Sequence, residues 1–250
     1  MKKIIISNIL CCAIFFISNQ ISAQNKTIIP PKATEFYEPA PPKISPGKSV
    51  NMPPSDALIL FDGTDLSAWE NNGSLATWTI EYGILTVKPG TGGITTTKAF
   101  GDVQIHLEWR SPSKIEGEGQ GRGNSGVLIM NKYEIQILDS FENETYTNGQ
   151  AASIYKQSPP LVNAATPPGV WNTYDIIFTA PRFNDDGMLL RPAKITVLHN
   201  GVLVQNNFEL RGPTEYIGIP NYTAHDEKLP IHIQDHLNPV SFRNIWVREL

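Results

Sequence analysis

The chain has 250 residues, 40% of them hydrophobic, which is enough for one large domain or two small ones. With 20 basic and 24 acidic side chains it carries a net charge of −4 and has no basic tract, so its composition argues against nucleic-acid binding. The two cysteines, Cys11 and Cys12, are too few for a disulfide framework or a structural zinc site. Twenty prolines and 19 glycines favour a turn-rich β protein over a helical one.

Residues 1–23 have the features of a secretory signal peptide. Lys2 and Lys3 precede an apolar run at residues 4–17, and Ala23 is the small residue before the expected cleavage point. The run is too short to cross about 30 Å of hydrocarbon comfortably. We therefore expect a secreted or periplasmic protein with no membrane span after signal removal. Lipid anchoring is the alternative.

Residues 24–54 are predicted to be a proline-rich linker. The segment contains eight prolines and shows little hydrophobic periodicity, which is typical of an extended tether. Phe36 and Tyr37 would let it dock against a folded domain. That domain is expected to span residues 55–250.

Short strands separated by turns are predicted throughout residues 55–250. Residues 103–110 alternate strictly between apolar and polar, the period of a strand with one buried face. Tyr82-Gly83 and Asn200-Gly201 are predicted hairpin turns. Further strands are expected at 57–61, 78–81, 84–87, 127–130, 133–138, 151–155, 174–179, 194–199, 202–205, 231–234 and 241–250. This pattern predicts an all-β sandwich, or jelly roll.

Residues 121–126, Gly-Arg-Gly-Asn-Ser-Gly, match the dinucleotide-binding fingerprint. That fingerprint works where a strand turns into a helix whose N-terminus holds pyrophosphate. Here the glycines lead into the strand-like residues 127–130, so a nucleotide role is not expected. The favoured interpretation is a flexible connection that brings Asn124 and Ser125 to the start of a strand.

Residues 133–139 contain the most informative polar pattern. In a regular strand Glu134 and Gln136 share one face. A bulge at residues 137–138 would bring Asp139 into the same row, with two carboxylates flanking an amide. Such a row can bind a sugar through hydrogen bonds and perform acid–base chemistry. The alternative is the polar outer face of a half-buried strand.

The strand at residues 103–110 contributes a second pair of candidates. Glu108 and Arg110 share its polar face, so they could join the same surface. Arg110 would then pair with a carboxylate or polarise a substrate oxygen. A cross-strand ion pair is the equal alternative.

His236 is the best candidate among five histidines for a general base or a metal ligand. It ends an apolar strand beside Gln234 and Asp235, with Arg243 following closely. A structural histidine is the alternative. No cofactor is required by the sequence, and a divalent metal ion stays open. The acidic turn at residues 184–187 lacks the later ligands of a calcium loop.

The order of these segments from Leu58 to Leu250 resembles the 3-keto-disaccharide hydrolase domain family. The residues that carry the resemblance are Leu60-Phe61-Asp62-Gly63, Leu66, Trp69, Trp78, Gly83, Glu108-Trp109-Arg110, Gly123-Asn124-Ser125-Gly126, Tyr133 to Asp139, Ile154-Tyr155, Gly169 to Asn172, Asn200-Gly201, Ile233 to His236 and Phe242 to Ile245. The resemblance implies a concanavalin A-like lectin/glucanase fold and a carbohydrate partner.

The segment from Glu134 is also similar to the catalytic strand of family 16 glycoside hydrolases, whose bulged pattern is Glu-x-Asp-x-x-Glu. Glu134 matches the nucleophile position. Gln136 replaces the central aspartate, and Asp139 replaces the acid/base glutamate. Both departures weaken an ordinary retaining mechanism, because the central charge is lost and Asp is one methylene shorter.

The first family implies cleavage of a 3-keto-glucoside by proton removal at C2, elimination and hydration. Under this hypothesis Glu134 or His236 is the base, Arg110 stabilises the enolate, alone or with a metal, and Asp139 donates the proton to the leaving group. The expected substrate-binding residues are Glu108, Asn124, Gln136, Tyr155, Gln234 and Arg243. An ordinary retaining β-glucanase and a non-catalytic, lectin-like module are the alternatives.

Overall fold

The structure is a computed structural model that describes residues 29–250, so the expected signal peptide and the start of the expected linker lie outside the described residues. The chain divides after Lys43 into two compact units. In the first, η1 (Pro31–Thr34) is one exposed 3-10 turn. Across residues 29–250 no helix has the length and apolar character needed to cross a membrane.

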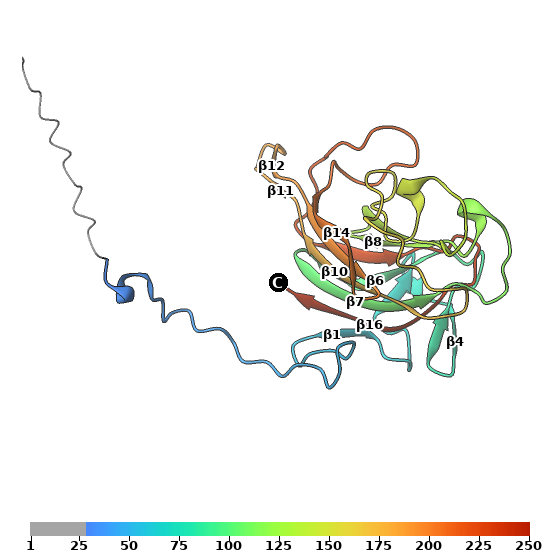
Figure 1. Cartoon of the computed structure of the whole chain (residues 1–250), viewed down its shortest axis with the longest axis horizontal. Helices are drawn as coiled ribbons and strands as arrows, with labels where there is room; N and C mark the ends of the chain where they lie inside the picture. The colour runs from blue at the N-terminus through green and yellow to red at the C-terminus, as the bar shows by residue number, and fades with distance from the viewer. Residues whose placement is uncertain (1–28) are drawn as a thin grey trace, which may run out of the picture. The chain divides into compact units, whose positions relative to one another are not determined.

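The second unit, residues 44–250, is built from two main antiparallel sheets (Figure 1). The eight-stranded sheet has the order β14-β13-β10-β7-β16-β5-β4, with β1 also pairing with β16. Its strands are β1 (Leu58–Phe61), β4 (Thr79–Glu81), β5 (Ile84–Thr86), β7 (Val103–Arg110), β10 (Asn172–Thr179), β13 (Lys194–His199), β14 (Val202–Glu209) and β16 (Ser241–Glu249).

The six-stranded sheet has the order β3-β2-β6-β15-β8-β9. Its strands are β2 (Trp69–Asn71), β3 (Ser74–Leu75), β6 (Ile94–Phe100), β8 (Ser125–Ile129), β9 (Tyr133–Ile137) and β15 (Leu229–Ile233). The strands β11 (Arg182–Phe183) and β12 (Leu189–Arg191) form a separate hairpin, and two short 3-10 turns are η2 (Gly119–Gly121) and η3 (Thr147–Gly149).

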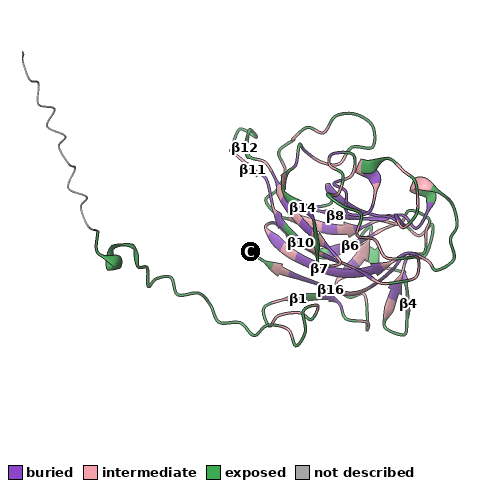
Figure 2. Cartoon of the chain, viewed as in Figure 1, coloured by how far each residue is buried: buried purple, intermediate pink, exposed green. Residues whose placement is uncertain are grey.

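One hydrophobic core lies between the two sheets (Figure 2). On β7 the alternate residues Ile105, Leu107 and Trp109 belong to this core, as period-two strand geometry requires. From the other sheet, β9 adds Tyr133, whose ring lies 5.5 Å from that of Phe178 on β10. The predicted all-β sandwich is therefore confirmed.

Both predicted hairpin turns are present. Tyr82 and Gly83 connect β4 to β5 with φ of 53° and 75°, and Asn200 and Gly201 connect β13 to β14 with φ of 53° and 75°. Positive φ at both central residues matches the right-handed twist of the paired strands, and Asn and Gly tolerate it best.

The prediction of a regular strand at residues 151–155 is wrong, because this segment forms only isolated bridges. Ala152 has a φ of 63°, and only Ile154 makes isolated bridges. The segment still lies beside β9, because Ala152 N donates to Gln136 O at 2.9 Å. A single left-handed residue bends the chain away from a regular ladder while leaving some cross-strand hydrogen bonds intact.

Residues 44–54 belong to the compact second unit, so the division falls earlier in the chain than the linker boundary expected after residue 54. Ser55 N donates to Ser45 O at 2.9 Å, which closes this segment into a loop. The carbonyl of Asn51 accepts hydrogen bonds from Asn244 Nδ2 at 2.8 Å and Trp246 Nε1 at 3.2 Å. These bonds hold the loop against β16.

Candidate active site

A cavity of about 370 Å³ opens on the outer face of the six-stranded sheet. The core side of β8, β9 and β15 is formed by Val127, Ile135 and Ile233, and alternate residues of the same strands face the cavity. The cavity is lined by Asn124, Leu128, Glu134, Gln136, Tyr155, Thr214, Tyr216, Gln234 and His236.

Glu134 lines this cavity from β9. Its backbone N–H donates to Thr214 Oγ1 at 2.9 Å, and its carbonyl accepts from Tyr155 N at 3.2 Å. The residue is 7% exposed, and burial raises the pKa of its carboxyl group to about 7 from an ordinary value of 4.5. The carboxyl group can therefore exchange a proton near neutral pH.

Gly126, opposite Gln136 on β8, makes room for that carboxylate. A Cβ atom at position 126 would lie 2.6 Å from Glu134 Oε1 and 3.2 Å from its Cδ. Any larger residue would therefore displace the carboxylate. This close approach gives a physical reason for the last glycine of the 121–126 motif, which does not bind a nucleotide through a helix N-terminus here.

Two buried amides lie beside the carboxylate. Gln136 Nε2 donates to Gln120 Oε1 at 3.0 Å, and with its amide reversed the same nitrogen would instead donate to Ser125 O at 2.9 Å and to Glu134 Oε1 at 3.2 Å. Asn124 Nδ2 donates to Gln120 O at 2.7 Å. Asn124 is 3% exposed, and its Oδ1 has no hydrogen-bond partner within the described part of the chain. A buried acceptor that lines a cavity without a partner is suited to a ligand hydroxyl.

The end of β15 places His236 at the mouth of the cavity. The Asp235 carboxylate is already hydrogen-bonded to the backbone, since its Oδ2 accepts from Gly90 N at 2.8 Å and Gly92 N at 3.0 Å. Ser125 Oγ also donates to Gln234 O at 2.7 Å. These bonds fix the strand end, while His236 is exposed and can meet a substrate.

The remaining wall comes from segments without strand periodicity. Thr214 and Tyr216 belong to the connection between β14 and β15, and sequence reasoning missed both. Lys156 Nζ lies 4.2 Å from the Tyr216 ring centroid and donates to Tyr216 O at 2.6 Å. Their loop carries no motif or repeating apolar pattern, so the sequence held no signal for them.

Asp139 is not brought into the expected row. The pairing of β8 with β9 is regular from Tyr133 to Ile137, where β9 ends, so the bulge predicted at residues 137–138 falls beyond this ladder. Asp139 N donates to Arg122 O at 3.1 Å. Asp139 accepts from Arg122 Nε at 2.7 Å and lines a separate cavity of about 190 Å³. Its carboxylate therefore faces Arg122, and it does not line the cavity that holds Glu134.

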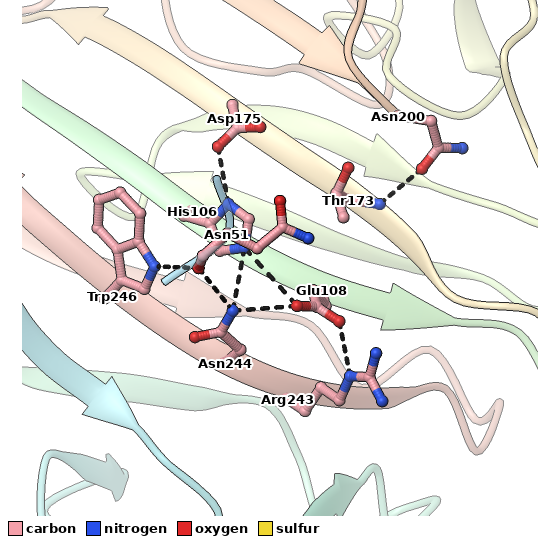
Figure 3. Close-up of polar contacts among 9 residues, drawn as sticks. All are labelled: Asn51, His106, Glu108, Thr173, Asp175, Asn200, Arg243, Asn244 and Trp246. Atoms are coloured by element: carbon pink, nitrogen blue, oxygen red, sulfur yellow. Dashed lines mark hydrogen bonds and ion pairs between the residues drawn. The ribbon is translucent and has the colours of Figure 1, made fainter. Parts of the chain in front are cut away.

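Glu108, Arg110 and Arg243 lie on the outer face of the opposite sheet, with the hydrophobic core between them and the cavity. Arg243 Nε donates to Glu108 Oε2 at 2.6 Å, and Asn244 Nδ2 donates to Oε1 at 3.0 Å (Figure 3). Arg110 stacks on the Trp171 ring at 4.6 Å. The expectation that these residues share one surface with Glu134 is wrong, because strand alternation does not say in which sheet a strand lies.

Trp69, Trp78 and Trp109 belong to the hydrophobic core, whereas Trp246 is buried on the outer face of its sheet, where its ring lies 5.2 Å from that of His106. His199 is also internal. Its Nε2 lies 2.9 Å from Asn172 Oδ1, and burial lowers its pKa to about 4.

The residues present do not form a recognisable metal centre. Across residues 29–250, no three His, Cys, Asp or Glu side chains come together as a set of ligands. The cavity offers one carboxylate, Glu134, and one imidazole, His236, beside neutral amides and hydroxyls. We therefore derive no step through a metal ion.

The fold and the cavity define a β-sandwich protein with an acid- and amide-lined site on one sheet. The sequence profile of the 3-keto-alpha-glucoside-1,2-lyase-like domain matches residues 56–248, so the chain belongs to that family. The resemblance drawn from the sequence is confirmed.

Three proteins illustrate the relationship. A 3-keto-disaccharide hydrolase of Bacteroides thetaiotaomicron is 24% identical over 226 residues, covering 77% of this chain and 78% of its own. A crystal structure from Parabacteroides distasonis, provisionally described as a glycosyl hydrolase, is 49% identical with a TM-score of 0.84, and covers 89% of this chain and 97% of its own. A second such structure from that organism is 21% identical with a TM-score of 0.57, over 78% and 94% of the two chains, and shows the fold alone.

Proposed function

We propose that this protein cleaves the glycosidic bond of 3-keto-disaccharides or 3-keto-glucosides by elimination and hydration. Membership of the family and the relative named a 3-keto-disaccharide hydrolase support this reaction class. The observation that carries the proposal is the buried carboxyl group of Glu134, whose pKa of about 7 suits a general base at neutral pH.

The reaction begins with removal of the C2 proton, which the neighbouring C3 carbonyl acidifies. Glu134 takes this proton, and the electron pair moves onto the C3 oxygen as an enolate. When the pair returns, the C1–O bond breaks and the leaving oxygen takes a proton from His236. Water then adds to C1 and returns a proton to His236, while Glu134 gives its proton back to C2. The products are a 3-keto-sugar and the free alcohol.

The neighbouring polar groups support binding in this scheme. Asn124 Oδ1 is a buried acceptor, and the amides of Gln136 and Gln234 line the same cavity. They would hold the sugar hydroxyls and orient the C2–H bond toward the carboxylate. Asp139, Arg110, Glu108 and Arg243 have no part in this scheme.

The two alternatives are less well supported. A retaining β-glucanase needs a second carboxyl group about 5 Å from the nucleophile. Asp139, the only match to that position, is ion-paired with Arg122 and lines a different cavity. A sugar-binding module gains nothing from a buried carboxyl group that keeps its proton near neutral pH, because burial of that group costs free energy.

The test is turnover of a panel of 3-keto-disaccharides, with and without chelator, monitored for the free keto-sugar. Glu134→Gln should reduce kcat/KM by about 100-fold or more, the scale of lost acid–base catalysis. Glu108→Gln is the matched control, since it changes a buried strand carboxylate on the other sheet, and its activity should stay within a few-fold of wild type. Near-native turnover by Glu134→Gln would remove Glu134 from the mechanism. Sugar binding without consumption by the wild type would favour the lectin-like alternative.

A further inference from the structure

The proposed reaction creates a negative charge on the C3 oxygen, and this charge needs a hydrogen-bond donor in the cavity. Arg110, the donor expected from the sequence, lies on the opposite sheet. Among the cavity-lining residues, Tyr155 is a phenol next to the general base. Its backbone N–H donates to Glu134 O at 3.2 Å, so the two side chains start from neighbouring backbone positions.

A second tyrosine stands behind this phenol. The hydroxyl oxygens of Tyr146 and Tyr155 are 2.7 Å apart, with ring centroids separated by 6.3 Å. When Tyr146 donates in this pair, the Tyr155 O–H is left free to point elsewhere. A hydroxyl that already accepts a hydrogen bond is also a stronger donor, because hydrogen bonds in a chain polarise one another.

The Tyr146 ring is held in place by the backbone of η3. Gly149 N donates to Tyr146 O at 3.0 Å, and a Cβ at position 149 would lie 2.0 Å from the Tyr146 ring atom Cε2. The ring therefore packs against bare backbone, a contact that only glycine permits. This packing fixes the position from which Tyr146 reaches Tyr155.

The surroundings keep Tyr155 protonated. Burial raises the pKa of Tyr155 above its ordinary value, and the nearby carboxylate of Glu134 acts in the same direction. Lys156 Nζ lies 5.8 Å from the Tyr155 ring centroid and 5.9 Å from that of Tyr146, which adds a positive charge at the rim. A neutral phenol beside an ionised base is a hydrogen-bond donor and not a second base.

We propose that Tyr155 donates the hydrogen bond that stabilises the enolate oxygen, and that Tyr146 is the residue that positions it. This inference rests on the proposed function. No bond to Tyr155 breaks: the C2 proton goes to Glu134, the electron pair goes to the C3 oxygen, and the pair returns when the C1–O bond breaks. Tyr155 is thereby a catalytic residue and more than a ligand for a hydroxyl.

The test separates enolate formation from bond cleavage. A 3-keto sugar without a leaving group at C1, such as the 3-keto form of 1,5-anhydroglucitol, can lose its C2 proton but cannot eliminate. Exchange of that proton in D₂O is followed by NMR, and turnover of a 3-keto-disaccharide is measured in parallel. The variants are Tyr155→Phe and Tyr146→Phe, with Tyr82→Phe on the fully exposed β4–β5 turn as the control.

Tyr155→Phe should slow both exchange and kcat by about 100-fold or more, the usual cost of losing one donor to an oxyanion, with KM changed by less than about threefold. Tyr146→Phe should slow both by about 5- to 10-fold, because Tyr155 keeps its hydroxyl and loses only its orientation. Tyr82→Phe should match wild type.

Three results would overturn the inference: wild-type exchange by Tyr155→Phe, a raised KM with unchanged kcat in that variant, or wild-type rates in Tyr146→Phe. If Tyr155→Phe does not fold, as judged by thermal unfolding, the Tyr146→Phe result decides. A wild-type protein that neither exchanges nor cleaves any keto-sugar removes the proposed function itself. An active wild type with a fully active Tyr155→Phe removes only the role of the tyrosines.

Discussion

Glu108 and Glu134 are both buried carboxylates on strands, one on the outer face of each sheet, and their surroundings differ. Glu108 is 6% exposed and is bonded to Arg243 and Asn244 in a network that also reaches His106 (Figure 3). Glu134 is 7% exposed and has a glutamine amide and a phenol for neighbours. Burial is nearly the same, and the partners are different.

The difference separates a structural acid from a reactive one. A cation beside a buried carboxylate compensates for lost hydration, so the acid becomes part of the fold. Without a cation, burial acts alone and raises the pKa, as it does for Glu134. The same alternation of polar residues along a strand can therefore produce either outcome.

The largest effect that would test this contrast is on stability. The pKa of Glu134 rises from 4.5 to about 7 on folding, so the folded state holds a proton that the unfolded state loses between those values. Stability should therefore be unaffected below about pH 4.5 and fall as pH rises from there to about 7, by up to about 3 kcal/mol. Glu134→Gln should remove this fall and be the more stable protein at pH 8. Denaturant unfolding at pH 4 and pH 8 measures it, and equal gains at both values would contradict burial of an ionisable group as the cause.

The pH dependence of activity follows from the same ionisation. Only ionised Glu134 can accept the C2 proton, so kcat/KM should rise about tenfold per pH unit on the acidic side and level off near pH 7. Between pH 4 and pH 6, on the acidic limb, the expected gain is about 100-fold. The Glu108→Gln variant should show the same rise of kcat/KM with pH as the wild type. If kcat/KM instead reached half of its plateau near pH 4.5, Glu134 would keep an ordinary pKa.

Gly126→Ala should move the carboxylate without changing the sheet. The added methyl would lie 2.6 Å from Glu134 Oε1, the flexible end of the side chain, so the carboxylate must shift. We expect kcat/KM to fall by about 10-fold or more through loss of alignment, with little change in thermal stability. Gly73→Ala is a control, because a Cβ there meets no atom within 4 Å, although its φ of 75° will cost some stability. Wild-type activity of Gly126→Ala would show that the carboxylate has room to move.

The smallest effect concerns the opposite face. Arg243→Gln leaves Glu108 buried with Asn244 as its remaining donor, and should lower the free energy of unfolding by about 1–2 kcal/mol while leaving activity unchanged. The expected loss is modest because the Arg243 side chain is 43% exposed. Arg110→Gln, which loses a stacking contact but no ion pair within residues 29–250, should cost less. A loss of turnover in either variant would break the separation of the two faces.

The sequence was sufficient for the fold class, the two hairpin turns and the shared face of Glu134 and Gln136, because alternation and turn chemistry are local. It could not say that β7 belongs to the other sheet from β9, so the partners expected for Arg110 are wrong. The bulge expected before Asp139 came from the spacing of residues 133–139, and the spacing could not show that Asp139 would pair with Arg122. Tyr216 escapes prediction because an irregular loop carries it to the cavity from far along the chain.

The loop at residues 44–55 has a practical consequence for anyone shortening the chain. Its Asn51 carbonyl is the acceptor for Asn244 and Trp246, and the same Asn244 amide group bonds Glu108. A recombinant fragment that starts at the family boundary near residue 56 would leave the indole N–H of Trp246 facing water. Cutting before Ile44 preserves both acceptor bonds, which makes that position the safer start for expression and crystallisation.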